Sequence, residues 1–143
     1  MLATTIALAM IQQPTASRFD LGIRLKQLDV AWMTVSDSNR REKAVPPITK
    51  AVYSFFGQRF SDGCRSLDEA RAALLGRNLL AGDAITLRLE PAVVEPGQKA
   101  NLKISWSYIP EPANAVKVRI GREYKTLQPG EPLETTVDVP IVT

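Results

Sequence analysis

The sequence predicts an α+β protein in which a small N-terminal helical hairpin or three-helix unit is followed by an antiparallel β-sandwich. Apolar residues recur every three or four positions up to about residue 75 and at every second position from residue 85 onward. The 143-residue chain is 45% apolar and 23% charged, as is ordinary for globular proteins. We therefore interpret residues 1–17 as a signal peptide, 18–76 as a helical unit, 77–83 as a linker and 84–143 as a β-rich region.

The N-terminal segment is expected to be a targeting signal. Residues 2–11 form an uncharged, mainly apolar run, which suits the hydrophobic part of a signal peptide and is too short to span a bilayer. Small residues at 15–17 then offer a cleavage site just before Arg18. No Lys or Arg precedes the run, so a wrongly assigned start codon and a buried helix remain alternatives. The segment predicts a periplasmic or secreted protein with no membrane association after signal removal.

The first helix is expected from about Phe19, and either Ser17 or Asp20 could cap its N-terminus. One face of this helix is apolar and consists of Leu21, Leu25, Leu28, Trp32 and Val35. We expect Trp32 to be buried in the core of the helical unit.

A polar turn at residues 36–39 precedes a second helix, which Pro46 and Pro47 are expected to break or restart. Beyond the prolines, another apolar face ends near Gly57 and consists of Ile48, Ala51, Val52, Phe55 and Phe56. Ser61 or Asp62 could cap a third helix, whose apolar face consists of Cys64, Leu67, Ala70, Ala73 and Leu74.

Residues 54–73 resemble the helix-turn-helix junction of a tetratricopeptide repeat. The matching features are an aromatic pair before a short polar turn, followed by Phe60, Gly63, Leu67 and Ala70. Gln58 stands where the repeat prefers glycine, and no second copy occurs at the period of the repeat. The resemblance therefore implies one helical hairpin packed on the first helix rather than a peptide-binding array.

Strands are expected where the apolar period becomes two, at residues 85–89, 102–108 and 116–120. Pro-Gly turns fall at residues 95–98 and 128–131, and a last apolar stretch at 137–142 contains Pro140, which predicts an edge strand or the start of a connection.

This spacing resembles an immunoglobulin-like sandwich, with Trp106 as its core aromatic residue. About five strands are recognisable, whereas such sandwiches usually have seven or more. Either the sheet is small and depends on the helices, or the domain is incomplete in this sequence.

The composition excludes most catalytic chemistry. Histidine is absent, and the single Cys64 has neither a disulfide partner nor a His to activate it. Nucleophile elbows, phosphate loops, dinucleotide-binding glycines and calcium loops are all missing. We therefore assign no catalytic, cofactor-binding or metal-binding residue and expect no cofactor. An enzyme that uses a pair of carboxylates remains a minor alternative.

The basic residues indicate no nucleic-acid site. A net charge of +3 produces only a weak electrostatic attraction for nucleic acid. The basic group at Lys117, Arg119, Arg122 and Lys125 lacks the row of aromatic residues expected of a stacking platform for single-stranded nucleic acid, so we interpret it as a solvated sheet face. The expected partner is a protein.

Four short segments resemble the helical region that precedes the catalytic domain of some large exported bacterial α/β-hydrolases of the prolyl-oligopeptidase and esterase kind. They are residues 25–32, 43–47, 55–56 and 67–71. A β-rich region and then the hydrolase domain follow the helices in those proteins. The resemblance implies an exported, non-catalytic accessory or interaction module, or alternatively the N-terminal part of an exported serine hydrolase whose catalytic residues lie outside this sequence.

Overall fold

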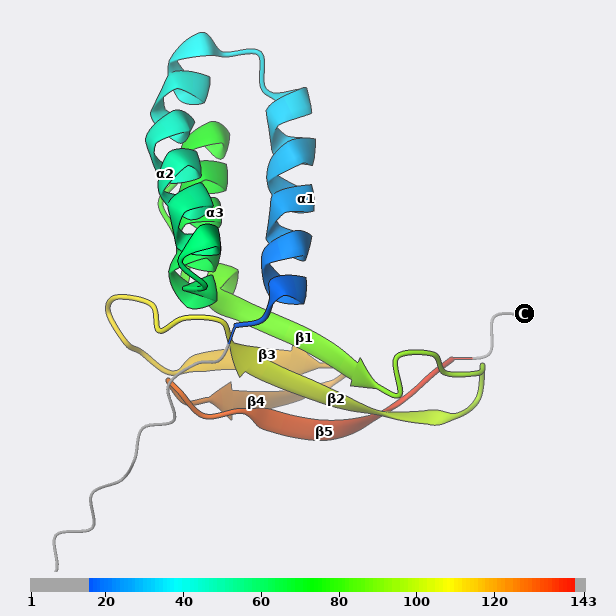
Figure 1. Cartoon of the computed structure of the whole chain (residues 1–143). Helices are drawn as coiled ribbons and strands as arrows, with labels where there is room; N and C mark the ends of the chain where they lie inside the picture. Colours follow the sequence, from blue (N-terminus) through cyan, green and yellow to red (C-terminus); the bar gives the residue numbers. More distant parts are fainter. Residues whose placement is uncertain (1–15, 141–143) are drawn as a thin grey trace, which may run out of the picture.

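The computed structural model describes residues 16–140, and within them the chain forms three α-helices, a short 3-10 helix and two small antiparallel sheets (Figure 1). The predicted α+β class is confirmed. The elements in chain order are α1 Arg18–Thr34, α2 Ser38–Phe56, α3 Phe60–Leu75, η1 Ala81–Ala84, β1 Ile85–Glu90, β2 Lys99–Trp106, β3 Val116–Ile120, β4 Glu123–Leu127 and β5 Leu133–Asp138. Figure 1 shows the helices standing on one side of the sheets, with the start of α1 next to β1.

Helix α3 is the central element of the helical unit, because it packs against both α1 and α2. The close approach depends on Gly63, where an added Cβ would lie 2.7 Å from Leu21 Cδ1. Residues shared among the helices form the first core cluster: Leu28, Ala31, Ala44, Ala51, Leu67, Ala70 and Leu74. Gly63 therefore lies at a close contact between α3 and α1.

Helix α1 packs most of the predicted face into the helical core, since Leu28 is buried and Leu21, Trp32 and Val35 pack against that core. The fully buried positions, however, include two charged residues that were not predicted. Asp20, Arg24, Leu28 and Ala31 are buried, whereas Leu25 is exposed. Asp20 and Arg24 can be buried because each forms an ion pair with a residue of another element, Arg88 of β1 and Asp68 of α3. Ser17 caps the helix and forms a reciprocal capping box with Asp20.

Helix α2 continues through Pro46 and Pro47, so the predicted break is wrong. Proline lacks an amide hydrogen, which leaves the carbonyls of Glu42 and Lys43 without their usual helical donors. Both of these residues are exposed, so water can hydrate the two carbonyls. Asp37, in the predicted polar turn, accepts from the amides of residues 39 and 40 and caps the helix.

Helix α3 begins earlier than predicted, because neither Ser61 nor Asp62 is its N-cap. Arg59 occupies the N-cap position, and no side-chain capping bond forms there. Asp62 instead lies in the first turn, where its negative charge interacts favourably with the positive end of the helix dipole. Gly76, in the left-handed conformation with φ 64°, ends the helix.

The strands form a three-stranded sheet in the order β1-β2-β5 and a two-stranded sheet of β3 and β4. In the first sheet, Ile104 of β2 lies opposite Leu87 of β1 and Leu133 of β5. Strand β4 lies against β5, where Lys125 Nζ donates to Thr135 Oγ1 over 2.9 Å. The two sheets and Cys64 of α3 share the second core cluster: Cys64, Ala84, Ile104, Trp106, Tyr108 and Leu127.

Both predicted Pro-Gly turns are confirmed. The amide of Gln98 donates to the carbonyl of Glu95, and that of Glu131 donates to the carbonyl of Gln128, each over 3.1 Å. Gly97 and Gly130 have φ values of 85° and 78°, which these turns require at their third position. The predicted strand at residues 137–142 corresponds to β5, which begins earlier and pairs only with β2, while residues 141–143 lie outside the described part.

The two tryptophans differ in burial. Trp106 is 4% exposed, and its indole nitrogen donates to the carbonyl of Gln128 over 2.7 Å, which confirms its predicted place in the core. Trp32 is only partly buried, packs on the edge of the helical core and has the Arg41 guanidinium 5.2 Å from its ring centroid. Trp32 is therefore less buried than predicted.

Replacement of the two tryptophans should affect stability unequally. Trp106→Ala removes a buried side chain and should lower the free energy of unfolding by about 3–5 kcal/mol. Trp32→Ala should cost less than half as much, because part of its ring is already solvated. Urea denaturation followed by circular dichroism would measure both losses. Equal losses, or a larger loss at Trp32, would contradict this assignment of the cores.

Candidate functional site

A buried polar cluster joins the helices to the first sheet. Arg24 Nε of α1 donates to Asp68 Oδ2 of α3 over 2.8 Å, and these side chains are only 5% and 2% exposed. Tyr108, two residues after β2, donates its hydroxyl to the same carboxylate oxygen over 2.9 Å. A hydrogen bond between the hydroxyls of Thr86 and Ser107 completes the cluster.

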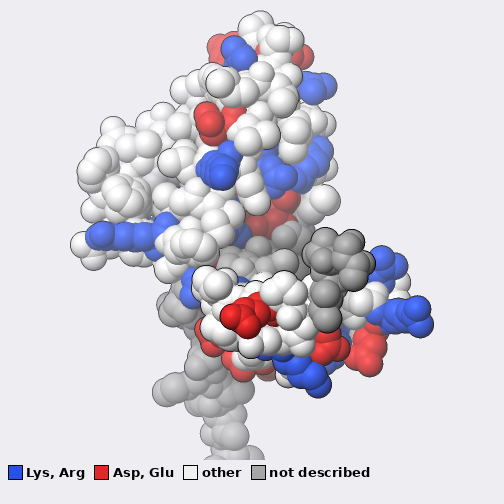
Figure 2. All heavy atoms as spheres, turned by 90° about the vertical axis from the view of Figure 1, so that its right-hand side faces the viewer, with Lys and Arg blue, Asp and Glu red and all other residues white. Residues whose placement is uncertain are grey.

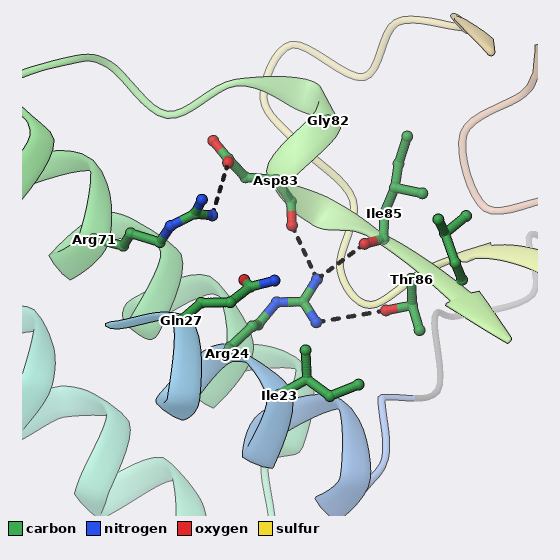
Figure 3. Close-up of a pocket in the computed structure, with 9 residues that line it drawn as sticks. Ile23, Arg24, Gln27, Arg71, Gly82, Asp83, Ile85 and Thr86 are labelled. Atoms are coloured by element: carbon green, nitrogen blue, oxygen red, sulfur yellow. Dashed lines mark hydrogen bonds and ion pairs between the residues drawn. The ribbon is translucent and has the colours of Figure 1, made fainter. Parts of the chain in front are cut away.

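The contacts of Arg24 decide what the cluster can do (Figure 3). A guanidinium carries five N–H donors, one on Nε and two on each terminal nitrogen. In addition to the bond from Nε to Asp68, Nη1 of Arg24 lies 3.4 Å from the Asp20 carbonyl and 3.5 Å from Thr86 Oγ1. The other terminal nitrogen, Nη2, lies 2.9 Å from the Asp83 carbonyl and 3.4 Å from the Ile85 carbonyl. Every donor therefore has an acceptor within the protein, and none remains for a ligand.

Burial also sets the protonation of the cluster. It raises the pKa of Asp68, and the nearby Arg24 charge and the two hydrogen bonds offset this effect only in part. Burial, together with the neighbouring Asp68 charge, raises the pKa of Tyr108 far above its usual value, so the phenol stays a hydrogen-bond donor. The cluster acts as a structural junction, because its groups are saturated and enclosed.

A second ion pair anchors the start of α1. Asp20 Oδ2 accepts from the Ser17 amide, the Ser17 hydroxyl and Arg88 Nη2 of β1, at 2.7, 2.7 and 2.6 Å. Burial alone would raise the pKa of Asp20, but these hydrogen bonds outweigh it and hold the pKa below its usual value. The pair fixes the first turn of α1 on the outer face of β1.

A third carboxylate, Asp83, organises the segment predicted as a linker. It forms two 2.8 Å bonds with the Arg77 guanidinium, and its oxygen accepts from the Leu80 amide over 2.8 Å. These bonds outweigh burial and lower the pKa of Asp83. Arg71 lies 3.8 Å from the same carboxylate.

Next to this carboxylate lies a pocket of about 250 Å³ (Figure 3). Its lining includes Ile23, Gln27 and Thr86 together with the cations Arg24 and Arg71. Both cations are already engaged by protein acceptors, so the pocket offers no unpaired charge with which to select a small anion.

The structure leaves little chemistry for an enzyme among the residues it describes. Cys64 is free and fully buried, and burial raises the pKa of its thiol to about 11, as expected for an inert core cysteine. The carboxylates of Asp20, Asp68 and Asp83 converge on the junction, but each is bound by arginine. Within residues 16–140, no group of three or more His, Cys, Asp or Glu side chains is arranged to hold a metal.

Sequence reasoning did not identify this junction. The sequence does contain one indication of the junction. Charged and apolar residues at helical spacing lie on one buried face of α1: Asp20, Arg24, Leu28 and Ala31. The partners of Arg24 lie 44 and 62 positions away in the chain, and no local pattern relates them.

Two of the grooves on the surface of residues 16–140 are mainly apolar. One lies between α1 and α2, has a volume of about 230 Å³ and is lined by Leu21, Leu25, Ile48, Ala51, Val52, Phe55 and Leu67. The other lies beside β1, has a volume of about 620 Å³ and is lined by Phe19, Ile23, Leu87, Arg88, Leu89, Glu90, Ala92 and Leu102. Exposed apolar surface of this kind is a common mark of protein interaction sites.

Charges of both signs are interspersed on the face that Figure 2 presents, with uncharged surface between them. On the two-stranded sheet, Lys117 and Arg119 are exposed, as predicted for a solvated strand face. They lie opposite Thr126 and Tyr124, so no acidic residue faces them across the strand pair.

The comparisons with known proteins give no identification: no family model, curated protein or solved structure matches the chain. In the described part, residues 16–140, no helix is long and apolar enough to cross a membrane.

Removal of Arg24 should destabilise the junction strongly. Arg24→Met leaves the Asp68 carboxylate buried without its cation and should cost about 3–5 kcal/mol of unfolding free energy. The double variant Arg24→Met with Asp68→Leu should recover much of this loss, because apolar replacement of a whole buried pair is often neutral. Lys26→Met on the exposed face of α1 is the matched control. Urea denaturation would disprove the structural role if Arg24→Met cost no more than this control.

Stability should fall in acid because Asp20 and Asp83 have lowered pKa values in the folded state. The contribution of each carboxylate is complete above its unfolded pKa of about 3.9 and is lost as the pH falls through its folded pKa. Asp20→Asn and Asp83→Asn should therefore be less stable than the parent at pH 6, with a shallower loss of stability below pH 4. Urea midpoints between about pH 6 and 2.5 would test this. Parallel pH curves for parent and variants would contradict it.

Proposed function

We propose that the chain is an exported, non-catalytic accessory module that binds another protein. One observation carries the proposal: every N–H of the buried Arg24 guanidinium is bound within the protein, whereas two grooves on the surface are mainly apolar. Saturated polar groups suit a rigid scaffold, and apolar grooves suit recognition of another polypeptide.

The helical groove supports this proposal independently of the sheets. Its floor is formed by Leu67 of α3, and its walls are formed by apolar residues of α1 and α2. Tyr53 and Phe56, also on α2, are strongly exposed. Aromatic residues dominate the energetics of many protein interfaces, so this end of α2 is well suited to contact a partner.

The β-rich region is proposed to be immunoglobulin-like. The strand order β1-β2-β5 matches the order A-B-E of such a domain, and β3 with β4 then matches strand C and its neighbouring strand C′. Trp106 packs in the core that the two sheets share, as a central aromatic residue does in that fold.

Export is proposed from residues 1–17, and the contacts of Ser17 refine the expected cleavage site. Residues 1–15 lie outside the described part, whereas Ala16 packs against the second core and Ser17 caps α1. Cleavage just before Arg18 would remove this cap. We therefore place the start of the mature chain at or before Ala16, with the mature protein in the periplasm or secreted.

The alternative proposal is that the chain is an accessory region of an exported serine hydrolase whose catalytic residues lie elsewhere. One observation favours it, namely that Leu87 and Leu89 of β1 are exposed beside the second sheet, as in a unit built to pack on further polypeptide. Sequencing of the coding DNA beyond residue 143 separates the two proposals. A continuing frame with a Gly-x-Ser-x-Gly motif and a later His would favour the hydrolase.

The binding proposal predicts position-specific cross-linking. A photoreactive phenylalanine analogue at Phe56 should give a discrete protein adduct in the native host, whereas the same analogue at Asp29, on the exposed face of α1, should not. The mass of the uncross-linked protein would also show whether Ala16 and Ser17 are retained. Absence of any adduct from Phe56 and from Val52, or ester or peptide hydrolysis that survives repurification, would refute the proposal.

A further inference from the structure

The inner face of β1 is apolar but uncovered. Leu87 and Leu89 lie opposite Ile104 and Leu102 of β2, and directly opposed residues of an antiparallel pair point to the same face of the sheet. Ile104 is fully buried, yet Leu87 is 59% and Leu89 is 45% exposed. The face that forms the core under β2 therefore continues under β1 without a covering layer.

The position of the second sheet explains this exposure. Strand β4 lies against β5, as the bond from Lys125 to Thr135 shows, so β3 lies on the side nearer to β1. Figure 1 shows the same order, with β3 behind β1 and β2 and with β4 behind β5. Within residues 16–140, no strand pairs with the other edge of β3. One additional strand on this edge would lie under β1.

The space beside β1 is already shaped as a groove. Its volume is about 620 Å³, and its lining joins Leu87, Leu89 and Leu102 of the sheet to Phe19 and Ile23 of α1. No residue of β3 lines this groove, but Leu87 and Leu89 belong both to the groove and to the inner face of β1. A strand at the β3 edge would gain backbone hydrogen bonds from β3 and apolar contacts with these two leucines. This combination is the usual basis of recognition by β-strand addition.

The charges beside the open edge of β3 indicate which residues a strand bound there would carry. Lys117 and Arg119 project from the outer face of β3, opposite Thr126 and Tyr124. Neither cation has an ion pair within the described residues. An adjacent strand with acidic residues on its outer face would place carboxylates directly opposite them, a favourable cross-strand pairing.

We propose that the free edge of β3 and the uncovered inner face of β1 form an acceptor site for an extended segment of a partner protein, with apolar and acidic residues in alternation. This inference rests on the proposed binding function and deepens it by naming the surface and the ligand chemistry. A second copy of the chain fits poorly, because antiparallel pairing of two β3 edges would bring their Lys117 and Arg119 side chains together.

A peptide-binding experiment on the complete chain tests the proposal. The probe is a fluorescein-labelled nine-residue peptide of alternating valine and glutamate, with its ends blocked. Fluorescence anisotropy should show saturable binding, and amide hydrogen exchange should show new protection in β3. A peptide of alternating valine and lysine, and a valine-glutamate peptide with a central proline, should each bind at least about tenfold more weakly.

Two matched sets of variants locate the site. Leu87→Asp should weaken binding at least about tenfold, whereas Val30→Asp on α1, at a side chain of similar exposure, should leave it unchanged. The double variant Lys117→Glu with Arg119→Glu should reverse the preference towards the valine-lysine peptide. Lys26→Glu with Lys50→Glu makes the same change in charge away from the site and should keep the original preference. Circular dichroism would confirm that each variant is folded.

Three results would overturn the inference. They are equal binding of the proline-containing peptide, unchanged exchange in β3 on binding, and a dimer in sedimentation experiments that Leu87→Asp dissociates. The third result would identify a second copy as the occupant. None of them would affect cross-linking from the exposed Phe56 at the end of α2, so failure of this inference and failure of the proposed function can be told apart.

Discussion

The buried guanidinium of Arg24 is the constraint on which the arrangement of the molecule depends. Its positive charge persists at any ordinary pH, so a position that is only 5% exposed is tolerable only where acceptors surround it. Those acceptors come from α1 itself, from α3, and from the segment that enters β1. Because a guanidinium is planar, they must converge in fixed directions, which specifies how the helical unit stands on the sheet. The Arg24–Asp68 pair is therefore better understood as a determinant of specificity than as a source of large net stability.

This arrangement separates structural polar chemistry from the accessible surface. Asp20, Asp68 and Asp83 are committed to arginine partners, and Tyr108 is committed to Asp68. The remaining concave surfaces, between α1 and α2 and beside β1, are mainly apolar. A scaffold whose buried charges are paired internally and whose grooves are apolar can recognise another polypeptide without any catalytic group of its own.

The sequence predicted those features that local periodicity controls. The three helices, the main strands, the Pro-Gly turns and the buried Trp106 follow from spacing and turn chemistry. Continuity of α2 through Pro46 and Pro47 was missed, since it depends on whether the freed carbonyls reach water. The junction at Arg24 was missed because its partners come from elements far apart in the chain. Hydrophobic periodicity identifies apolar faces, but it does not identify a face on which charged residues are buried as pairs.

Strand β1 connects the two halves of the molecule through its alternation. Thr86 and Arg88 point to the helices and contact Arg24 and Asp20, whereas Leu87, between them, points to the opposite and uncovered face. A ligand that ordered β1 from its open face would also restrict the residues that hold α1. Thermodynamic linkage is reciprocal. If ligand binding stabilises the contacts between α1 and β1, then intact contacts between α1 and β1 must increase the affinity for the ligand by the same factor. If binding orders β1, the ion pairs of Arg24 and Asp20 and the proposed acceptor site therefore affect each other through this one edge strand.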